Sequence, residues 1–208
     1  MHGFNSTLIQ KPIAKPLPPS ARSSMPSIVL TPHPSIPCEA IRRFEVRLRK
    51  MDGGLSLEYS VEGDLASIRI PPPVLPQPTD GLWQATCFEA FFKPGLHSSA
   101  YYEFNFAPSA AWAVYRFTAY REGMAAVATI EPPKIVLRQD ANRLEMDALV
   151  DWDGLAFPAE CGECRLGLSA VIEDTQGNRS YWAGAHPPGK PDFHHRDSFA
   201  FKLDFSIL

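Results

Sequence analysis

Three of the six histidines lie in one short segment, residues 185–199, which reads AHPPGKPDFHHRDSF. A Pro-Pro-Gly-Lys-Pro stretch separates His186 from the pair His194 and His195. Because proline fixes φ and removes a backbone donor, this stretch can be neither helix nor central strand, which indicates a stiff loop. We call residues 185–199 the histidine loop. Its stiffness suits the wall of a binding pocket, and the alternative is a hydrogen-bonded connection between two strands.

A second group of polar residues lies in the predicted hairpin of residues 85–107, which contains ATCFEAFF and YYEFNF. The strand period of two separates Glu89, Glu103 and Asn105 from the Phe-rich face. A hairpin folded about His97 places Glu89 directly across from Asn105. A carboxylate beside an amide can hold the vicinal hydroxyls of a polar ligand, although an ordinary solvated sheet face has the same composition.

Two tryptophans lie close to these segments in the sequence. Trp83 comes just before the first hairpin strand, and Trp182 comes at the end of the SYWAG strand, shortly before the histidine loop. Binding sites of β-sandwiches form near strand ends, and the apolar face of a sugar stacks on such rings. We therefore expect both rings to line a ligand site, with a core position as the alternative for each.

Catalytic and metal-binding patterns are weak. Glu89 and Glu103, as neighbours on adjacent strands, do not by themselves supply the spacing that a glycosidase needs across a scissile bond. A triad of consecutive loop residues, such as 195, 197 and 198, cannot chain its hydrogen bonds in the required direction. The single C-x-x-C at Cys161 and Cys164 has no second pair and no βαβ context, so we predict neither a metal site nor a redox site. We expect a protein that is not an enzyme.

The elements that must position these residues are strands. Alternation of apolar and polar residues runs through RRFEVRLRK and GLSLEYSVEG and recurs in at least seven further segments, separated by turn signals such as MDGG and TQGN. No segment shows a sustained helical period. Short amphipathic strands must bury their apolar faces against each other, so we predict an all-β fold, an antiparallel β-sandwich of the jelly-roll or immunoglobulin-like type. The proline-rich residues 71–78 are expected to cross between the two sheets.

Length and composition indicate one globular domain. The chain has 208 residues, 45% of them hydrophobic, and a net charge of −3, which gives no electrostatic case for nucleic acid. Residues 1–25 mix Pro, Ser and Lys without periodicity and are expected to form a disordered tail before a domain over 26–208, with Met25 as an alternative start. The sequence shows no signal-peptide core and no membrane span, and its four cysteines are sparse, so we expect a cytoplasmic protein.

The runs LWQATCFEAFF, YYEFNFAPSAAWAVYRF and SYWAGAHPPGKPDFHH together resemble the DOMON-like superfamily, and within it a bacterial subgroup similar to the family-nine carbohydrate-binding modules. The resemblance covers roughly residues 27–208 and implies a β-sandwich that binds a sugar or haem. In the sugar-binding modules two tryptophans hold a terminal sugar between them, while a carboxylate and amides hold its hydroxyls. By motif position these roles fall on Trp83, Glu89, Asn105 and Trp182. The chain departs from the modules in lacking a secretion signal and in carrying the histidine loop.

The haem-binding half of the superfamily implies an alternative. There is no C-x-x-C-H motif, which excludes covalent haem attachment. A non-covalent haem b would use Met124, in a loop, with His195 as its partner, whereas Met146 alternates with core residues and is more simply apolar packing.

We therefore expect a non-catalytic domain that binds a sugar or sugar-like metabolite without a cofactor. The residues expected to line its site are Trp83, Glu89, Asn105, Trp182, His186, His194 and His195. Binding of haem b, and a structural or protein-interaction role without a small ligand, are the alternatives. No membrane or nucleic-acid partner is expected.

Overall fold

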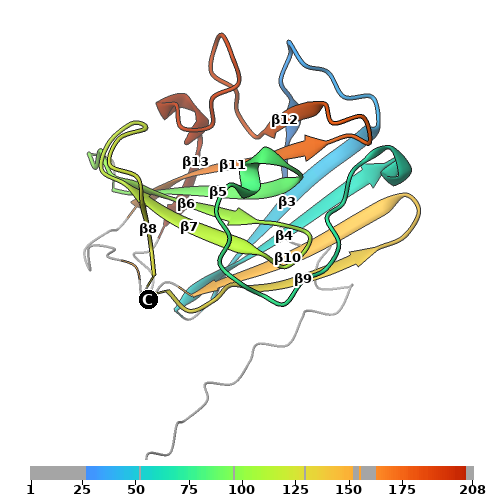
Figure 1. Ribbon diagram of the computed structural model, residues 1–208. Helices are drawn as coiled ribbons and strands as arrows, with labels where there is room; N and C mark the ends of the chain where they lie inside the picture. The colour runs from blue at the N-terminus through green and yellow to red at the C-terminus, as the bar shows by residue number, and fades with distance from the viewer. Residues whose placement is uncertain are drawn as a thin grey trace, which may run out of the picture.

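The computed structural model describes residues 27–51, 53–95, 97–128, 130–151, 155 and 163–204 (Figure 1). These residues form thirteen β-strands and three short 3-10 helices, and the strands pair into two antiparallel sheets that pack face to face. The predicted all-β sandwich is confirmed. The expected tail, Met25 and Cys161 lie outside the described residues. Among the described residues, no helix has the length and apolar character needed to cross a membrane.

Sheet A has five strands in the order β1-β3-β4-β10-β9. They are β1 (Ser27–Val29), β3 (Ile41–Met51), β4 (Gly54–Gly63), β10 (Arg143–Asp151) and β9 (Lys134–Gln139). The alternation in the sequence places Phe44 and Val46 in the core. β4 differs from the half-buried strand that its pattern predicts: Ser56 and Ser60 are also buried, because β4 lies in the middle of the sheet.

Sheet B has eight strands, seven of them in the order β2-β12-β11-β5-β6-β7-β8, with β13 also paired to β11. They are β2 (Thr31–Pro32), β12 (Arg179–Ala183), β11 (Glu163–Glu173), β5 (Cys87–Pro94), β6 (Tyr101–Phe106), β7 (Trp112–Phe117), β8 (Ala125–Ala126) and β13 (Phe201–Asp204). The predicted hairpin is β5 and β6, at the centre of this sheet.

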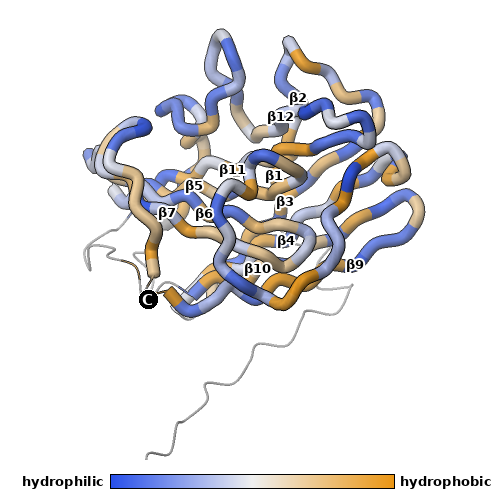
Figure 2. The backbone as a smooth tube through the Cα atoms, in the orientation of Figure 1, coloured by the Kyte–Doolittle hydropathy of each residue, from blue (hydrophilic) through white to orange (hydrophobic). Residues whose placement is uncertain are grey.

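The main core lies between the two sheets. Phe88 and Phe104 of sheet B project into it, and the Phe88 ring meets Phe44 of sheet A with ring centroids 5.6 Å apart. Both phenylalanines belong to the Phe-rich face that the sequence assigns to the core. Polar residues gather in the loops, including the tip of the β9–β10 hairpin, whereas the strands carry both kinds of residue in alternation (Figure 2).

A second apolar cluster covers the face of sheet B that points away from sheet A. We call this the outer face, and the cluster the outer cluster. Its buried members come from the strands and from the histidine loop, and Leu82, Trp83 and Tyr181 pack against it. They are Phe91, Tyr101, Ala113, Tyr115, Phe117, Val171, Ala183, Phe193 and Phe199. The outer face is therefore a packed surface rather than a solvated one.

Two segments reach the outer face, the end of the β4–β5 connection and the histidine loop. The chain crosses from β4 in sheet A to β5 in sheet B through the 3-10 helix η1 (Leu65–Ser67), the proline-rich residues 71–78 and the 3-10 helix η2 (Leu82–Gln84), as predicted for the crossing. η2 contacts β5 and β6. The histidine loop is the second segment, and it contains the 3-10 helix η3 (Arg196–Ser198).

The path of the histidine loop follows from strand pairing. β12 pairs with residues 169–173 of β11 and β13 pairs with residues 163–166, so the chain between them leaves the sheet and returns to the same strand. This excursion can be followed in red at the top of Figure 1. It packs closely on β11: a Cβ at Gly167 would lie 3.0 Å from the Ser198 carbonyl oxygen. Glycine at this position lets the loop approach the sheet.

Candidate functional site

Glu89 and Asn105 lie opposite each other at the centre of sheet B, as the sequence predicts. Ser169 of β11 pairs with Glu89 on the other side, so three polar side chains form a row across three adjacent strands. Glu103 is the diagonal neighbour of Glu89, two residues before Asn105 on β6. All four side chains are on the outer face, because the alternating residues Phe88 and Phe104 occupy the main core.

Hydrogen bonds connect this group. The Asn105 Nδ2 donates to Glu103 Oε1 at 2.7 Å, and the Ser169 Oγ donates to Glu89 Oε2 at 3.1 Å. The Cys87 Sγ donates to Asn105 Oδ1 at 3.5 Å. We call these five residues the carboxylate cluster. Their side chains hold one another in place on paired strands, which gives the cluster a fixed shape.

Burial distinguishes the carboxylate cluster from an ordinary polar sheet face. The exposed fractions are 2% for Glu89, 4% for Glu103 and 0% for Asn105. Burial raises the pKa of Glu103 to about 7, and burial together with the Glu103 charge raises the pKa of Glu89 well above its usual range. Burial and mutual repulsion therefore make both acids harder to ionise than exposed carboxyl groups. Such perturbed groups gather at binding and catalytic sites.

His194 is the histidine that reaches the carboxylate cluster. Its Nε2 lies 3.6 Å from Glu103 Oε2, and its Nδ1 is 2.8 Å from the Tyr101 hydroxyl. Burial lowers the pKa of His194 to about 4 and raises that of Tyr101 to about 12. Both groups are therefore neutral at pH 7, and His194 joins the loop to the sheet without a charge.

The other two histidines of the loop lie elsewhere, contrary to the expectation that all three line the site. His195 is an N-cap: its Nδ1 accepts a hydrogen bond from the Asp197 backbone N–H at 3.2 Å, at the start of η3. His186 donates from Nε2 to the Thr31 carbonyl at 2.8 Å and packs against His33 with ring centroids 5.0 Å apart. The prolines hold His186 at one end of the loop and the histidine pair at the other.

Asp192 holds the histidine loop to the turn after β7. Its Oδ1 accepts from Arg121 Nη2 at 2.8 Å and its Oδ2 accepts from the Tyr120 hydroxyl. The same carboxylate accepts from the His194 backbone N–H at 3.1 Å. The Arg121 backbone N–H in turn donates to the Tyr101 hydroxyl at 3.2 Å. We call the contacts of Asp192 with Tyr120 and Arg121 the Asp192 clasp.

Trp83 stands at the edge of the outer cluster on η2 and is half-buried. Its ring meets that of Tyr115 edge to face, with centroids 5.7 Å apart and planes at 76°. Tyr115 pairs with Glu103 across β6 and β7, and its hydroxyl donates to Asp80 Oδ1 at 2.5 Å. Trp83 therefore lies beside Tyr115, the cross-strand neighbour of Glu103.

Trp182 is not part of the site, which corrects the prediction. It is 3% exposed and lies in the main core, where its ring centroid is 5.7 Å from that of Phe44. Its pairing with Ala170 places it on the same face of sheet B as Phe88. The neighbouring Tyr181 takes the outer face instead and packs against the outer cluster.

Sequence reasoning missed Tyr101, Tyr115 and Ser169. A signal existed for the two tyrosines, because in YYEFNF and WAVYRF the period of two sets Tyr101 on the face of Glu103 and Tyr115 on the face opposite Val114. Ser169 carries no such signal, since its place beside Glu89 depends on a pairing between strands far apart in the sequence.

The residues considered for a metal or haem differ in their surroundings. Met146 is fully buried in the main core, as expected, and Met124 is exposed. Cys164 is buried, and its Sγ donates to the Lys93 carbonyl at 3.1 Å. Over the ranges that the structure describes, no group of three or more His, Cys, Asp or Glu side chains is arranged to hold a metal ion.

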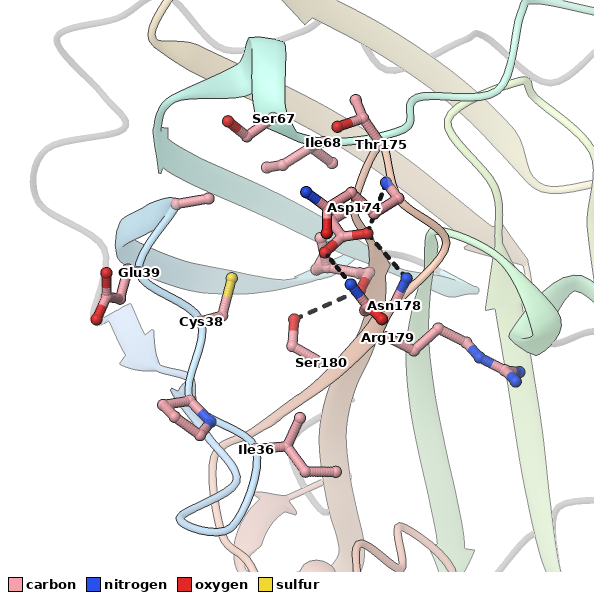
Figure 3. A pocket seen from close by; sticks show the side chains of 14 residues that line it. Ile36, Cys38, Glu39, Ser67, Ile68, Asp174, Thr175, Asn178, Arg179 and Ser180 are labelled. Atoms are coloured by element: carbon pink, nitrogen blue, oxygen red, sulfur yellow. Dashed lines mark hydrogen bonds between the residues drawn. The ribbon is translucent and has the colours of Figure 1, made fainter.

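A separate pocket of about 280 Å³ lies between the β2–β3 loop and the β11–β12 hairpin (Figure 3). Ile36, Cys38 and Ile68 are among its lining residues. Asp174, a charged residue of the pocket, stabilises the β11–β12 turn. Its carboxylate accepts a hydrogen bond from the Asn178 side chain at 2.9 Å and one from the Gln176 backbone N–H at 2.9 Å. The hydrogen bond from Asn178 lowers the pKa of Asp174. Glu39, Gln176 and Arg179 also line this pocket, so it carries polar and charged groups of its own.

Comparison with known proteins identifies the fold. No family model matches the sequence, and no curated protein matches it. Among solved structures, the chain is similar to one described as a "putative carbohydrate-binding protein" from Bacteroides uniformis, with 14% sequence identity, 88% of each chain covered and a TM-score of 0.63. A carbohydrate-binding module of family 9 from Caldicellulosiruptor kristjanssonii, in complex with glucose, aligns over 94% of this chain and 91% of its own with 11% identity and a TM-score of 0.48. The chain shares its β-sandwich fold with the Bacteroides protein.

Proposed function

We propose that this chain is a non-catalytic domain that binds a sugar or sugar-like molecule at the carboxylate cluster. The observation that carries the proposal is the row of Ser169, Glu89 and Asn105, which is buried on the outer face although an ordinary polar row there would be solvated. The fold shared with a structure described as carbohydrate-binding supports the same ligand class.

The chemistry of the carboxylate cluster suits hydroxyl groups. Carboxylate oxygens accept hydrogen bonds from two neighbouring hydroxyls, while the amide of Asn105 and the hydroxyl of Ser169 can each donate and accept. Trp83 and Tyr115 supply aromatic surface at the edge of the cluster for the apolar face of a ring. In this arrangement one tryptophan and one tyrosine take the role that the sequence assigned to two tryptophans.

A ligand must displace part of the histidine loop to reach the carboxylate cluster. Phe193 and Phe199 of the loop pack on the outer cluster, and His194 stands against Glu103. The Asp192 clasp, by contrast, lies near solvent, because half of the Arg121 side chain is exposed. Exposed ion pairs contribute little to stability, so the clasp can open without unfolding the sheet beneath it.

The same groups argue against catalysis. His194 is neutral and bonded to Tyr101, and Glu103 is bonded to Asn105. In the histidine loop, the Ser198 Oγ donates to the Asp192 carbonyl at 2.9 Å, so it does not face His195 as a nucleophile faces its base. We therefore propose that the chain binds its ligand without catalysing a reaction.

A glycan array followed by titration calorimetry tests this function. Glu89→Gln keeps the size of the side chain but changes its hydrogen-bonding groups, and we expect it to weaken binding of any sugar that the wild-type chain retains. Glu62→Gln, on sheet A and distant from the carboxylate cluster, is the matched control and should bind as the wild type does. Unchanged binding by Glu89→Gln would place the sugar elsewhere.

A further inference from the structure

Among the residues that the structure describes, the two acids of the carboxylate cluster have no Lys or Arg side chain as a partner. Within the described residues, neither Glu89 nor Glu103 forms an ion pair with Lys or Arg. His194 presents its Nε2 to Glu103 at 3.6 Å, beyond hydrogen-bond distance, while its Nδ1 meets the Tyr101 hydroxyl. Among the described side chains, only Ser169 donates to Glu89, at Oε2. One oxygen of a nearly fully buried carboxylate thus has no donor among the residues described.

The cationic groups of the surrounding elements serve other partners or lie farther away. Arg121 pairs with Asp192 at 2.8 Å, on the outer side of His194. Lys93 and Arg165 share the outer face but lie beyond Phe91 along the strands, and the Arg165 Nε is 3.3 Å from Glu163 Oε1.

The remaining titratable groups around the two acids are neutral or negative. They are Cys87 on β5, Tyr101 on β6, Tyr115 on β7 with Asp80 beside it, and Tyr59, whose hydroxyl donates to the Glu89 carbonyl from sheet A. The cluster therefore has an uncompensated negative potential whenever its acids ionise.

Burying an ionised carboxylate without a counter-charge is costly, so a cation that entered the carboxylate cluster would stabilise the ionised form of its acids. The partner that fits here is a cation small enough to lie between Glu89 and Glu103. Aromatic rings at the edge of the cluster, Trp83 and Tyr115, favour a cation further through their π faces. A metal ion lacks the third ligand that it needs among the described His, Cys, Asp and Glu side chains.

We propose that the ligand carries a protonated amine, and that the carboxylate cluster selects amino sugars with a free ammonium group over neutral sugars. The inference rests on the proposed function and narrows its ligand class. The ammonium would donate to the free oxygen of Glu89 and to Glu103, while the hydroxyls of the sugar bind Asn105 and Ser169. A neutral sugar offers the same hydroxyls and leaves the acids without a counter-charge.

Calorimetry of the wild-type chain at pH 7 with matched ligands tests the selection. The ligands are glucosamine, glucose and N-acetylglucosamine, with galactosamine, galactose and N-acetylgalactosamine as a second series. Because charge-assisted hydrogen bonds are stronger than neutral ones, we expect at least one free amine to bind about tenfold or more tightly than both of its neutral counterparts. N-acetylation keeps the ring and removes the charge, so it isolates the contribution of the amine.

The pH dependence and a variant separate charge from shape. Affinity for the amine should fall between pH 7 and pH 5.5, because protons then occupy the acids that the ammonium needs, while affinity for a neutral sugar should not fall with it. Glu103→Gln should reduce the preference for the amine to a few-fold or less, and Glu62→Gln should keep it. Because the comparison of ligands uses the wild-type chain, it stands even if Glu103→Gln fails to fold.

Equal or tighter binding of the neutral sugars overturns the amine preference and leaves the proposed function in place. The preference is also overturned if neither series binds. In that case a neutral glycan retained on an array, with binding that Glu89→Gln abolishes, preserves the proposed function. An array without any retained glycan contradicts both proposals.

Discussion

Tyr101 and His194 join the sheet to the loop that covers it, through a bond of 2.8 Å between the tyrosine hydroxyl and the imidazole Nδ1. The two residues are 93 positions apart in the sequence, and their contact brings His194 Nε2 to 3.6 Å from Glu103. The histidine loop is therefore not a free connection between strands. It closes over the buried acids, so the proposed binding of a ligand at the carboxylate cluster requires the loop to move.

The two tryptophans should respond differently to truncation. Trp83→Ala removes a half-buried ring at the edge of the site and should weaken sugar binding by roughly 1 to 3 kcal/mol while the domain stays folded. Trp182→Ala leaves a cavity in the main core and should destabilise the fold by roughly 3 to 5 kcal/mol. Titration calorimetry and chemical denaturation of both variants check this. Loss of folding in Trp83→Ala would show that this ring is a core residue.

The stability of the chain should depend on the ionisation of Glu103. Its pKa is raised to about 7 in the fold, above the ordinary value of 4.5, so the folded state holds a proton that the unfolded state has lost. This contribution to stability is present at pH 4.5 and is lost as the pH rises through 7. Glu103→Gln does not titrate, so its melting temperature relative to wild type should be at least about 3 °C higher at pH 8 than at pH 5.

Calorimetric melting of both proteins from pH 5 to pH 8 measures this difference. The comparison removes the ionisation of Glu103 together with its effect on the pKa of Glu89, while the other titrating groups remain in both chains. A constant difference in melting temperature across this range would mean that Glu103 ionises as an exposed acid does.

Opening the Asp192 clasp should loosen the histidine loop alone. Asp192→Asn weakens the contact with Arg121, which is half exposed, so we expect a loss of stability of about 1 kcal/mol or less. Hydrogen exchange of residues 185–199 should become faster, while exchange in β5 and β6 stays as in wild type. Asp140→Asn, in the β9–β10 turn, is the control. Unchanged exchange in the loop would show that Phe193 and Phe199 hold it without the clasp.

Local patterns of apolar and polar residues in the sequence predicted much of the fold and about half of the residues of the candidate site. The alternation in β5 and β6 is enough to set Glu89 opposite Asn105, because a hairpin register depends only on the two strands and their turn. The sequence of β12 does not show in the same way which of its residues face the main core. Tyr181 and Trp182 are both large and aromatic, and only the pairing of Trp182 with Ala170 on β11 shows which of them faces the main core.

The role of the histidine loop depends on contacts that no short segment contains. The prolines predict its stiffness, but the choice of His194 over His186 and His195 follows from β12 and β13 sharing β11. Because of that shared pairing, His194 lies over β6, where it contacts Tyr101 and Glu103. The burial of Glu89 and Glu103 was not predictable from the hairpin alone, for which a solvated sheet face was the simpler interpretation.

The location of a bound sugar tests most directly whether the carboxylate cluster is the binding site. In a crystal structure of the chain with a sugar that it binds in solution, we expect ring hydroxyls within hydrogen-bond distance of Glu89 or Asn105 and the histidine loop displaced from its position against Glu103. A sugar seated in the pocket beside Cys38, or anywhere that leaves Glu89, Glu103 and Asn105 without contact, would contradict the claim that the carboxylate cluster is the binding site.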